Sequence, residues 1–217
     1  PGGNIHLRSE KGVTYDLGAT FAIGKSQRYS LEGGVTWFDS HITDWISWLP
    51  TTKGFFSPRN VGRVHAYGIE SNLRMNYIPA EKWHCTLMLN YSWTPSINRG
   101  PAMSEGDRSV GQQLPYVPRH SATATGSISY RRWTLTYQWN YYSRRFTMTS
   151  NESTITGALP TYFMNNLIIE KQIVTRPLDL NLKLAVNNLF NEDYVSVLSR
   201  PMPGINFEFF VTFTPRW

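Results

Sequence analysis

Residues 83–93 read WHCTLMLNYSW, and apolar and polar side chains alternate along most of this stretch. Successive side chains of a β-strand point to opposite faces, so the pattern predicts a strand with one apolar and one polar face. Its length also suits a tilted strand that crosses a bilayer, which needs roughly 9–11 residues. The stretch therefore predicts a strand of a transmembrane β-barrel, with its apolar side chains in lipid and its polar side chains in the lumen.

The same period of two recurs along the chain between clusters of turn residues. We expect nine strands, at residues 13–23, 29–39, 63–77, 83–93, 119–130, 133–146, 162–171, 178–188 and 205–213. Short turns near residues 25, 80, 131 and 175 alternate with long loops near residues 50, 105, 152 and 197. Tight periplasmic turns and longer external loops are typical of outer-membrane barrels. The expected fold class is all-β, an antiparallel transmembrane β-barrel.

Composition agrees with a membrane-facing surface. Charged residues make up only 17% of the 217 residues, below the quarter that is usual for soluble domains, and aromatics reach 14%. No stretch approaches 18 uninterrupted apolar residues, which excludes a helical membrane span. The formal charge is +6, but the cations are scattered, so no nucleic-acid partner is expected.

No motif for catalysis is present, and the chain is not expected to be an enzyme. The five histidines show no ligand spacing and Cys85 is the single cysteine, so no catalytic residue, cofactor or metal site is expected. Two alternatives stay open. A soluble carbohydrate-binding β-sandwich would distribute loop lengths less regularly, and a non-transporting barrel would serve in adhesion or as a scaffold.

An odd number of strands cannot close as an even-stranded bacterial barrel, and open sheet edges in lipid leave backbone groups unsatisfied. We therefore expect residues 1–217 to form the carboxyl-terminal part of a larger barrel domain. The remaining strands would come from another chain or from a further stretch of the same polypeptide.

Ligand-binding residues are expected on the external loops, because loops carry function on a rigid scaffold. The main candidates are Trp45, Trp48, Phe55, Phe56, Arg59 and Asn60. The two tryptophans equally suit the outer aromatic girdle. Secondary candidates for an anionic ligand are Arg99, Arg108 and Arg144, with solvated loop charges or lipopolysaccharide contacts as the alternative. Glu70 and Arg74 are expected to face the lumen and to form ion pairs with barrel or plug neighbours.

Several segments resemble the carboxyl-terminal half of TonB-dependent outer-membrane receptors. They are LRSEKG at 7–12 with YDLG at 15–18, NVG at 60–62 with YGIE at 67–70, VNNLFNEDY at 186–194, and PG at 203–204. The chain departs from the family pattern at Ile205 and Asn206, where an arginine commonly follows the glycine. Family members commonly end on an aromatic residue that the barrel-assembly machinery reads, a role that Phe213 or Trp217 fits.

This resemblance implies a 22-stranded barrel in the bacterial outer membrane, plugged by an amino-terminal globular domain that lies outside this chain. It also implies import of a large, scarce nutrient, driven through the inner-membrane TonB–ExbB–ExbD complex. Residues 37–45, 48–60 and 67–70 look most like cobalamin receptors of Bacteroides-type bacteria, which adds a surface lipoprotein lid as a partner. Ferric siderophores and haem stay open as ligands, because substrate choice depends on variable loops.

Overall fold

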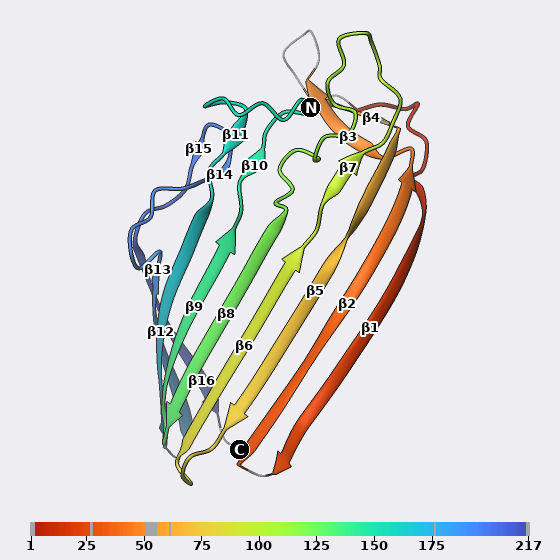
Figure 1. The fold of residues 1–217 in the computed structure, drawn as a ribbon. Coiled ribbons are helices and arrows are strands. Elements are labelled where there is room, and N and C mark those ends of the chain that lie inside the picture. The colour runs from red at the N-terminus through yellow and green to blue at the C-terminus, as the bar shows by residue number, and fades with distance from the viewer. Residues whose placement is uncertain (1–2, 27, 51–55, 61, 176, 216–217) are drawn as a thin grey trace.

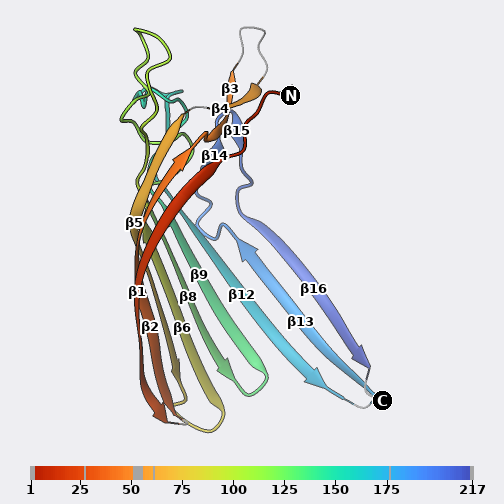
Figure 2. The same ribbon diagram turned by 90° about the vertical axis from the view of Figure 1, so that its right-hand side faces the viewer.

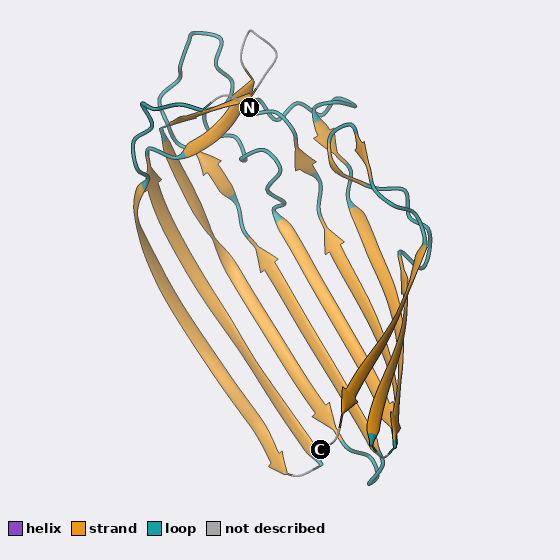
Figure 3. Ribbon diagram, turned by 180° about the vertical axis from the view of Figure 1, so that it is seen from behind, coloured by secondary structure: helices purple, strands orange, loops and turns teal. Residues whose placement is uncertain are grey.

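The protein is described from a computed structural model, which covers residues 3–26, 28–50, 56–60, 62–175 and 177–215. The expected all-β fold is confirmed: every regular element in these ranges is a strand (Figure 3). The described residues contain no helix with the length and apolar character needed to cross a membrane.

Nine long strands form one antiparallel sheet in which each strand lies beside the long strand that precedes it (Figure 1). Their order across the sheet is β1-β2-β5-β6-β8-β9-β12-β13-β16. The strands are β1 (Lys11–Ser26), β2 (Tyr29–Thr43), β5 (Arg63–Tyr77), β6 (Trp83–Trp93), β8 (His120–Tyr130), β9 (Trp133–Tyr142), β12 (Tyr162–Val174), β13 (Leu178–Asn187) and β16 (Asn206–Pro215). The expected number and order of long strands are therefore confirmed within the described part of the chain.

The long connections contain short strands that the sequence pattern did not predict. They form the ribbons β3 (Ile46–Pro50) with β4 (Phe56–Asn60), β10 (Arg145–Phe146) with β11 (Ala158–Leu159), and β14 (Val195–Val197) with β15 (Arg200–Pro201). A further strand, β7 (Ser96–Asn98), continues the line of β6 and pairs with β5. These short strands gather at one end of the long strands, which we call the loop end (Figure 1). The tight turns lie at the opposite end of the long strands, which we call the turn end.

The expected strand boundaries need small corrections. The strand expected over 133–146 stops at Tyr142, and its continuation pairs separately as β10. The strand expected over 178–188 stops at Asn187 because Asn188 has a φ of 50°, which turns the chain out of the sheet. The last strand begins at Asn206 and extends to Pro215, beyond the expected end at Phe213.

The two faces of the sheet differ as the alternation predicts. We call the face that carries Tyr67, Leu73 and Leu87 the apolar face, and the other the polar face. Aromatic residues border the apolar face at both ends, with Trp83 against Tyr130 at the turn end, where the ring centroids are 4.5 Å apart. On the polar face, side chains bond across strands, as Asn90 does by donating to Thr123 at 3.0 Å.

The curved sheet is open, and its outer strands β1 and β16 pair on one side only among the described strands (Figure 2). Few apolar side chains are buried, and those that are lie mostly toward the loop end, among them Val64, Ile97 and Leu114. The apolar face instead exposes large residues such as Leu17 and Val35. A sheet of this kind is stable only when lipid covers the apolar face and further strands cover its edges.

Candidate functional site

The side chain of Gln113 connects the loops at the loop end. Its carboxamide oxygen accepts from the backbone N–H of Ser96 on β7 at 3.1 Å, and its own backbone N–H donates to the side chain of Asn151 at 2.8 Å. The Asn151 amide donates back to the Gln113 carbonyl at 2.8 Å. Gln113 is only 2% exposed. It therefore fixes the loop after β7 against both β7 and the loop after β10.

A pocket of about 210 Å³ opens beside this junction. It is lined by Ser47, Asn98, Pro101, Met103, Ser104, Asp107, Ser109, Gln113, Leu114, Pro115 and Thr149. Hydroxyl and amide groups dominate the polar part of the lining, and Asp107 is its single charged side chain. Asn98 and Ser96 are two residues apart on β7 and share the polar face, whereas Arg99 points to the other face. Because Asn98 lines the pocket, the pocket lies on the polar side of the sheet.

Asp107 makes a tight turn in the pocket wall. Its carboxylate accepts from the backbone N–H groups of Met103 and Ser109, both at 2.8 Å. The Met103 N–H is the main cause that lowers the pKa of the Asp107 carboxyl below its ordinary value, and hydrogen bonds from Ser109 add to it. Asp107 is therefore ionised at neutral pH, and its backbone partners hold the turn in one conformation.

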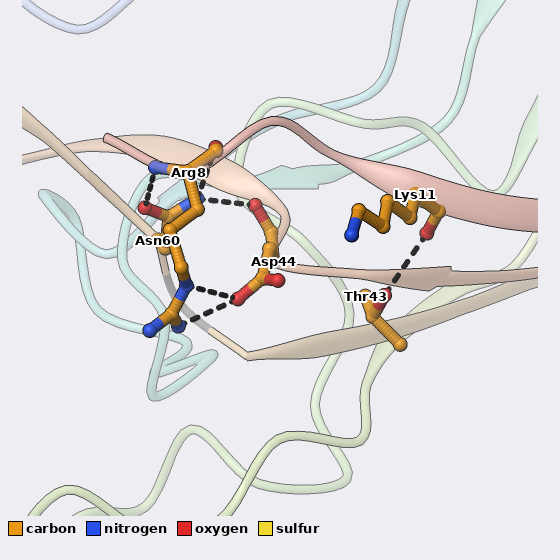
Figure 4. Close-up of polar contacts among 5 residues, drawn as sticks. All are labelled: Arg8, Lys11, Thr43, Asp44 and Asn60. Atoms are coloured by element: carbon orange, nitrogen blue, oxygen red, sulfur yellow. Dashed lines mark hydrogen bonds and ion pairs between the residues drawn. The ribbon is translucent and has the colours of Figure 1, made fainter. Parts of the chain in front are cut away.

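A second polar network ties the approach to β1 to the ribbon of β3 and β4 (Figure 4). Arg8 pairs with Asp44, with 2.6 Å between the guanidinium Nη2 and the carboxylate Oδ1. The Asn60 amide accepts from the Arg8 backbone N–H and donates to the Arg8 carbonyl, both at 2.9 Å, and also donates to the Asp44 carbonyl at 2.5 Å. All the bonding groups of the Asn60 side chain are thus engaged within the protein.

The ribbon of β3 and β4 presents the main predicted ligand residues on different faces. Ser47 lies opposite Arg59, and Trp48 lies opposite Pro58. Arg59 therefore shares a face with the pocket-lining Ser47, whereas Trp48 occupies the other face and is 53% exposed. Trp45, which precedes the ribbon, donates its backbone N–H to Gly62 at 3.3 Å. Phe55 and the side chain of Phe56 lie outside the described residues.

The family to which the chain belongs follows from its sequence and its sheet together. A family model described as "TonB dependent receptor-like, beta-barrel" matches residues 1–189. The chain belongs to this family. Members are outer-membrane receptors rather than enzymes, and the exposed apolar face of this TonB-dependent receptor barrel has the character of a lipid-facing surface. No curated protein matches the chain.

Solved structures of receptors and transporters share the fold. The unliganded ferric citrate transporter FecA is 20% identical, with a TM-score of 0.63 over 85% of this chain and 27% of that chain. The copper transporter OprC is 16% identical, with a TM-score of 0.63 over 94% of this chain and 31% of that chain. The ferric-catecholate import receptor Fiu from K12 E. coli is 19% identical, with a TM-score of 0.61 over 97% and 28%. This TonB-dependent receptor chain thus spans less than a third of the length of each, and its sheet is part of a larger barrel.

The three secondary arginines of this TonB-dependent receptor chain lie in different segments of the loop end. Arg99 follows β7, and its backbone N–H donates to the Arg63 carbonyl at 2.8 Å. Arg108 is exposed in the loop between β7 and β8. Arg144 lies over the ring of Phe146 at 5.1 Å from its centroid. None of the contacts described for these three residues joins one of them to another.

Glu70 and Arg74 alternate with the lipid-facing residues of β5 and so share the polar face, as expected. Within the described ranges no ion pair joins either side chain to another residue, so the expected partners on the barrel or plug stay a prediction. Of the two residues suggested as the assembly signal, Phe213 is 62% exposed on the apolar face of β16. Trp217 lies outside the described residues.

Sequence reasoning missed two clusters that depend on tertiary structure. Asp39, His41 and His65 bring potential metal-binding atoms within 4.8 Å of one another, although the spacing of the histidines gave no sign of it. Their only signal in the sequence is the period of two between Asp39 and His41. Arg145 is 5% exposed, donates to the Val195 carbonyl at 3.1 Å and lies 4.8 Å from the centroid of the Tyr162 ring.

Proposed function

We propose that the chain forms the carboxyl-terminal part of the barrel of a receptor that imports a large, scarce nutrient across the bacterial outer membrane. Membership of the TonB-dependent receptor family is the observation that carries this proposal. In this proposal the remaining strands and a plug domain lie outside residues 1–217, and the TonB–ExbB–ExbD complex supplies energy through the plug. The loop end faces the cell exterior, where the loops first meet the nutrient.

The pocket at the loop end supports a role in ligand capture. Its volume of about 210 Å³ is below the roughly 300–1,000 Å³ that encloses a whole small molecule, so it would hold one part of a larger ligand. The hydroxyls of Ser104 and Thr149 in the lining suit the amide and hydroxyl groups of an uncharged ligand, because each can donate and accept hydrogen bonds. No cationic side chain lines the pocket.

This lining favours a cobalamin-type corrinoid, whose periphery carries amide groups, as the nutrient. An anionic ferric siderophore is the second candidate, and haem is the third. The siderophore is favoured by Arg59, which lies on the same face of its ribbon as Ser47. Arg108 and Arg144 are further cations in the loops of this end, and a larger anion would reach them.

The predicted ligand residues keep distinct roles in this proposal. Trp45 and Trp48 provide aromatic faces for the ligand or for the outer girdle, and Phe55 and Phe56 are kept as candidate ligand contacts. Arg59 contacts the part of the ligand beside the pocket. Asn60 shapes the ligand-binding ribbon through its bonds to Arg8 and Asp44. A surface lipoprotein lid would close over these loops.

Binding to the complete receptor tests the proposal. Calorimetry with cyanocobalamin, haemin and a ferric catecholate siderophore should show binding of one ligand, with cyanocobalamin expected. Ser104→Trp fills the pocket and should weaken that binding about tenfold or more, because the large ring occupies the volume meant for the ligand. Ala102→Trp is the matched control, since Ala102 lies in the same loop but does not line the pocket.

The outcomes distinguish the identity of the nutrient from the import role itself. Binding of the siderophore alone would remove the corrinoid and keep the import role. Binding of none of the three ligands, together with no energy-dependent uptake by cells that carry the receptor, would favour a non-transporting barrel.

A further inference from the structure

A recess of about 370 Å³ lies at the loop end, lined by three residues of β2, three of β5 and Arg99 after β7. Its lining includes His41, Thr43, Arg63, His65 and Arg99. The register of β2 and β5 runs without a break from Tyr29 against Tyr77 to Thr43 against Arg63. These side chains therefore lie on the same face as the lipid-facing residues of both strands.

Two arginines in the recess lie directly opposite each other. The pairing of β5 with β7 places Val64 against Asn98, and the next pair in that register is Arg63 against Arg99. The Arg99 N–H donates to the Arg63 carbonyl at 2.8 Å, which confirms that the pairing continues. Like charges that lie directly opposite repel each other. In the described part of the chain neither guanidinium has an ion pair or a side-chain hydrogen bond, so the pair lacks a counter-ion.

The recess lies at the depth of lipid headgroups. Tyr67 and Tyr77 are ten residues apart on the apolar face of β5, which is about 33 Å along a strand. At a tilt of about 40° this spans about 25 Å, the height of the apolar band of an outer-membrane barrel. Tyr67 then marks the outer boundary of the hydrocarbon. His65 and Arg63 follow it toward the loop end and reach the headgroup layer.

Asp39 fixes the two histidines of the recess. Its carboxylate accepts from Nε2 of His41 at 2.7 Å and from Nε2 of His65 at 2.8 Å. The three side chains also have donor atoms that would suit a metal ion. The two positively charged guanidinium groups repel a metal cation in the recess and attract an anion. Arginine also matches phosphate in geometry, with two parallel N–H donors.

We propose that Arg63 and Arg99 form a binding site for a phosphate group of an outer-leaflet glycolipid, on the outer wall of the barrel, in a recess whose wall includes His41 and His65. The recess is continuous with the lipid-facing surface, so a bound lipid would place its acyl chains beside Tyr67 and its phosphate between the arginines. The site would fix the depth and orientation of the receptor in the membrane. It is independent of which nutrient the receptor imports.

Native mass spectrometry of the purified complete receptor tests this site, with bisphosphorylated lipid A in detergent as the probe. The double variant R63Q/R99Q should bind lipid A about tenfold more weakly, because two charge-assisted contacts to phosphate are lost. The matched control K82Q/R132Q removes two cations at the turn end and should leave binding unchanged. Heat-modifiable electrophoretic mobility verifies that each variant forms a folded barrel.

Further measurements, most of them on the unaltered receptor, keep the test decisive even if the double variant fails to fold. Fully dephosphorylated lipid A should bind about tenfold more weakly than the bisphosphate form, and equal binding would refute a phosphate site. Inorganic phosphate at millimolar concentration should not displace the lipid, and displacement would point to a soluble anion instead. Loss of binding on addition of EDTA, or zinc binding that Asp39→Asn abolishes, would show a cation site and overturn the proposal.

Discussion

The imidazole rings of His41 and His65 stack with their centroids 4.4 Å apart and 9° between their planes. His41 lies directly opposite His65 in the register of β2 and β5. Both rings donate to Asp39, which lies on the same face of β2 two residues before His41. The stacking of His41 on His65 thus depends on the register of β2 and β5. In the sequence, the ribbon of β3 and β4 lies between these two strands.

Cysteine cross-linking tests this register. In a background with Cys85→Ser, the pair His41→Cys and His65→Cys should form a disulfide on mild oxidation, because residues directly opposite in an antiparallel pair lie about 4.5–5.5 Å apart between Cα atoms. Proteolytic cleavage between the strands followed by non-reducing electrophoresis detects the bond. The control pair Ile42→Cys and His65→Cys points to opposite faces and should remain reduced. A cross-link in the control pair alone would shift the register by one residue and reverse the faces of β2.

A charge introduced on the apolar face tests the lipid contact. Leu87→Lys lies near the middle of β6 on that face and should lower the free energy of unfolding in lipid vesicles by about 2–4 kcal/mol. Thr125→Lys on β8 is the matched control, because it carries the same charge at a similar depth on the polar face and should have a smaller effect. Denaturant titration followed by tryptophan fluorescence gives both values. Equal losses for the two variants would mean that lipid does not cover the face that carries Leu87.

The turn after β13 should depend strongly on Asn188. This side chain is 1% exposed, and its amide exchanges hydrogen bonds with the backbone of Glu192 at 2.8 and 2.9 Å and also donates to the Pro203 carbonyl at 3.3 Å. Asn188→Ala should reduce stability by about 2–3 kcal/mol, because buried backbone groups lose their partners and alanine resists a positive φ. Asn140→Ala removes a polar-face amide for which no side-chain bond is described and should cost less. If both variants lose the same stability, the turn does not depend on the Asn188 hydrogen bonds.

The pocket wall should respond to acid through Asp107. Hydrogen bonds from the backbone lower the pKa of this carboxyl in the folded loop, so the carboxylate stabilises the loop above the ordinary aspartate pKa of about 3.9. That stabilisation is lost as the pH falls from this value through the lower pKa of the folded state. Hydrogen exchange of the Met103 and Ser109 amides, corrected for intrinsic rates, should stay slow from pH 7 to about pH 4 and accelerate below it.

A neutral side chain separates this effect from general acid unfolding. Asp107→Asn should give faster exchange of both amides even at pH 7, because a neutral amide accepts weaker hydrogen bonds than a carboxylate. Asp193→Asn, in another loop of the same end, should leave the two amides unchanged. Protection that persists unaltered in Asp107→Asn would contradict the role of the charge.

The strands could be predicted because the pattern that defines a strand involves only residues close together in the sequence. The alternation along Trp83–Trp93 requires no partner to be recognised, since a period of two and the length of the strand already define a two-faced element. The order of the sheet followed as well, because short turns force neighbouring strands to pair with each other. Strand ends were less well placed, as at Tyr142, after which the chain pairs separately as β10, and at Asn187, where the positive φ of Asn188 ends the pairing.

The loop end was not predictable in the same way. The separation of Trp48 from Arg59 onto two faces depends on how β3 pairs with β4, and residues 46–60 show no clear alternation. The bonds of Asn60 to Arg8 join residues 52 apart, and those of Gln113 to Asn151 join residues 38 apart. Such contacts depend on where the loops fold over the sheet, which the local pattern does not encode.

Local sequence patterns are enough to define a two-faced antiparallel sheet with tight turns at one end and long loops at the other, because each of these features repeats over short distances along the chain. Which residues become neighbours depends on the fold of the whole chain: Arg63 opposite Arg99, His41 opposite His65, and the loop residues around the polar pocket. The physical reason is register, since the pairing of distant strands sets which residues become neighbours and on which face they lie.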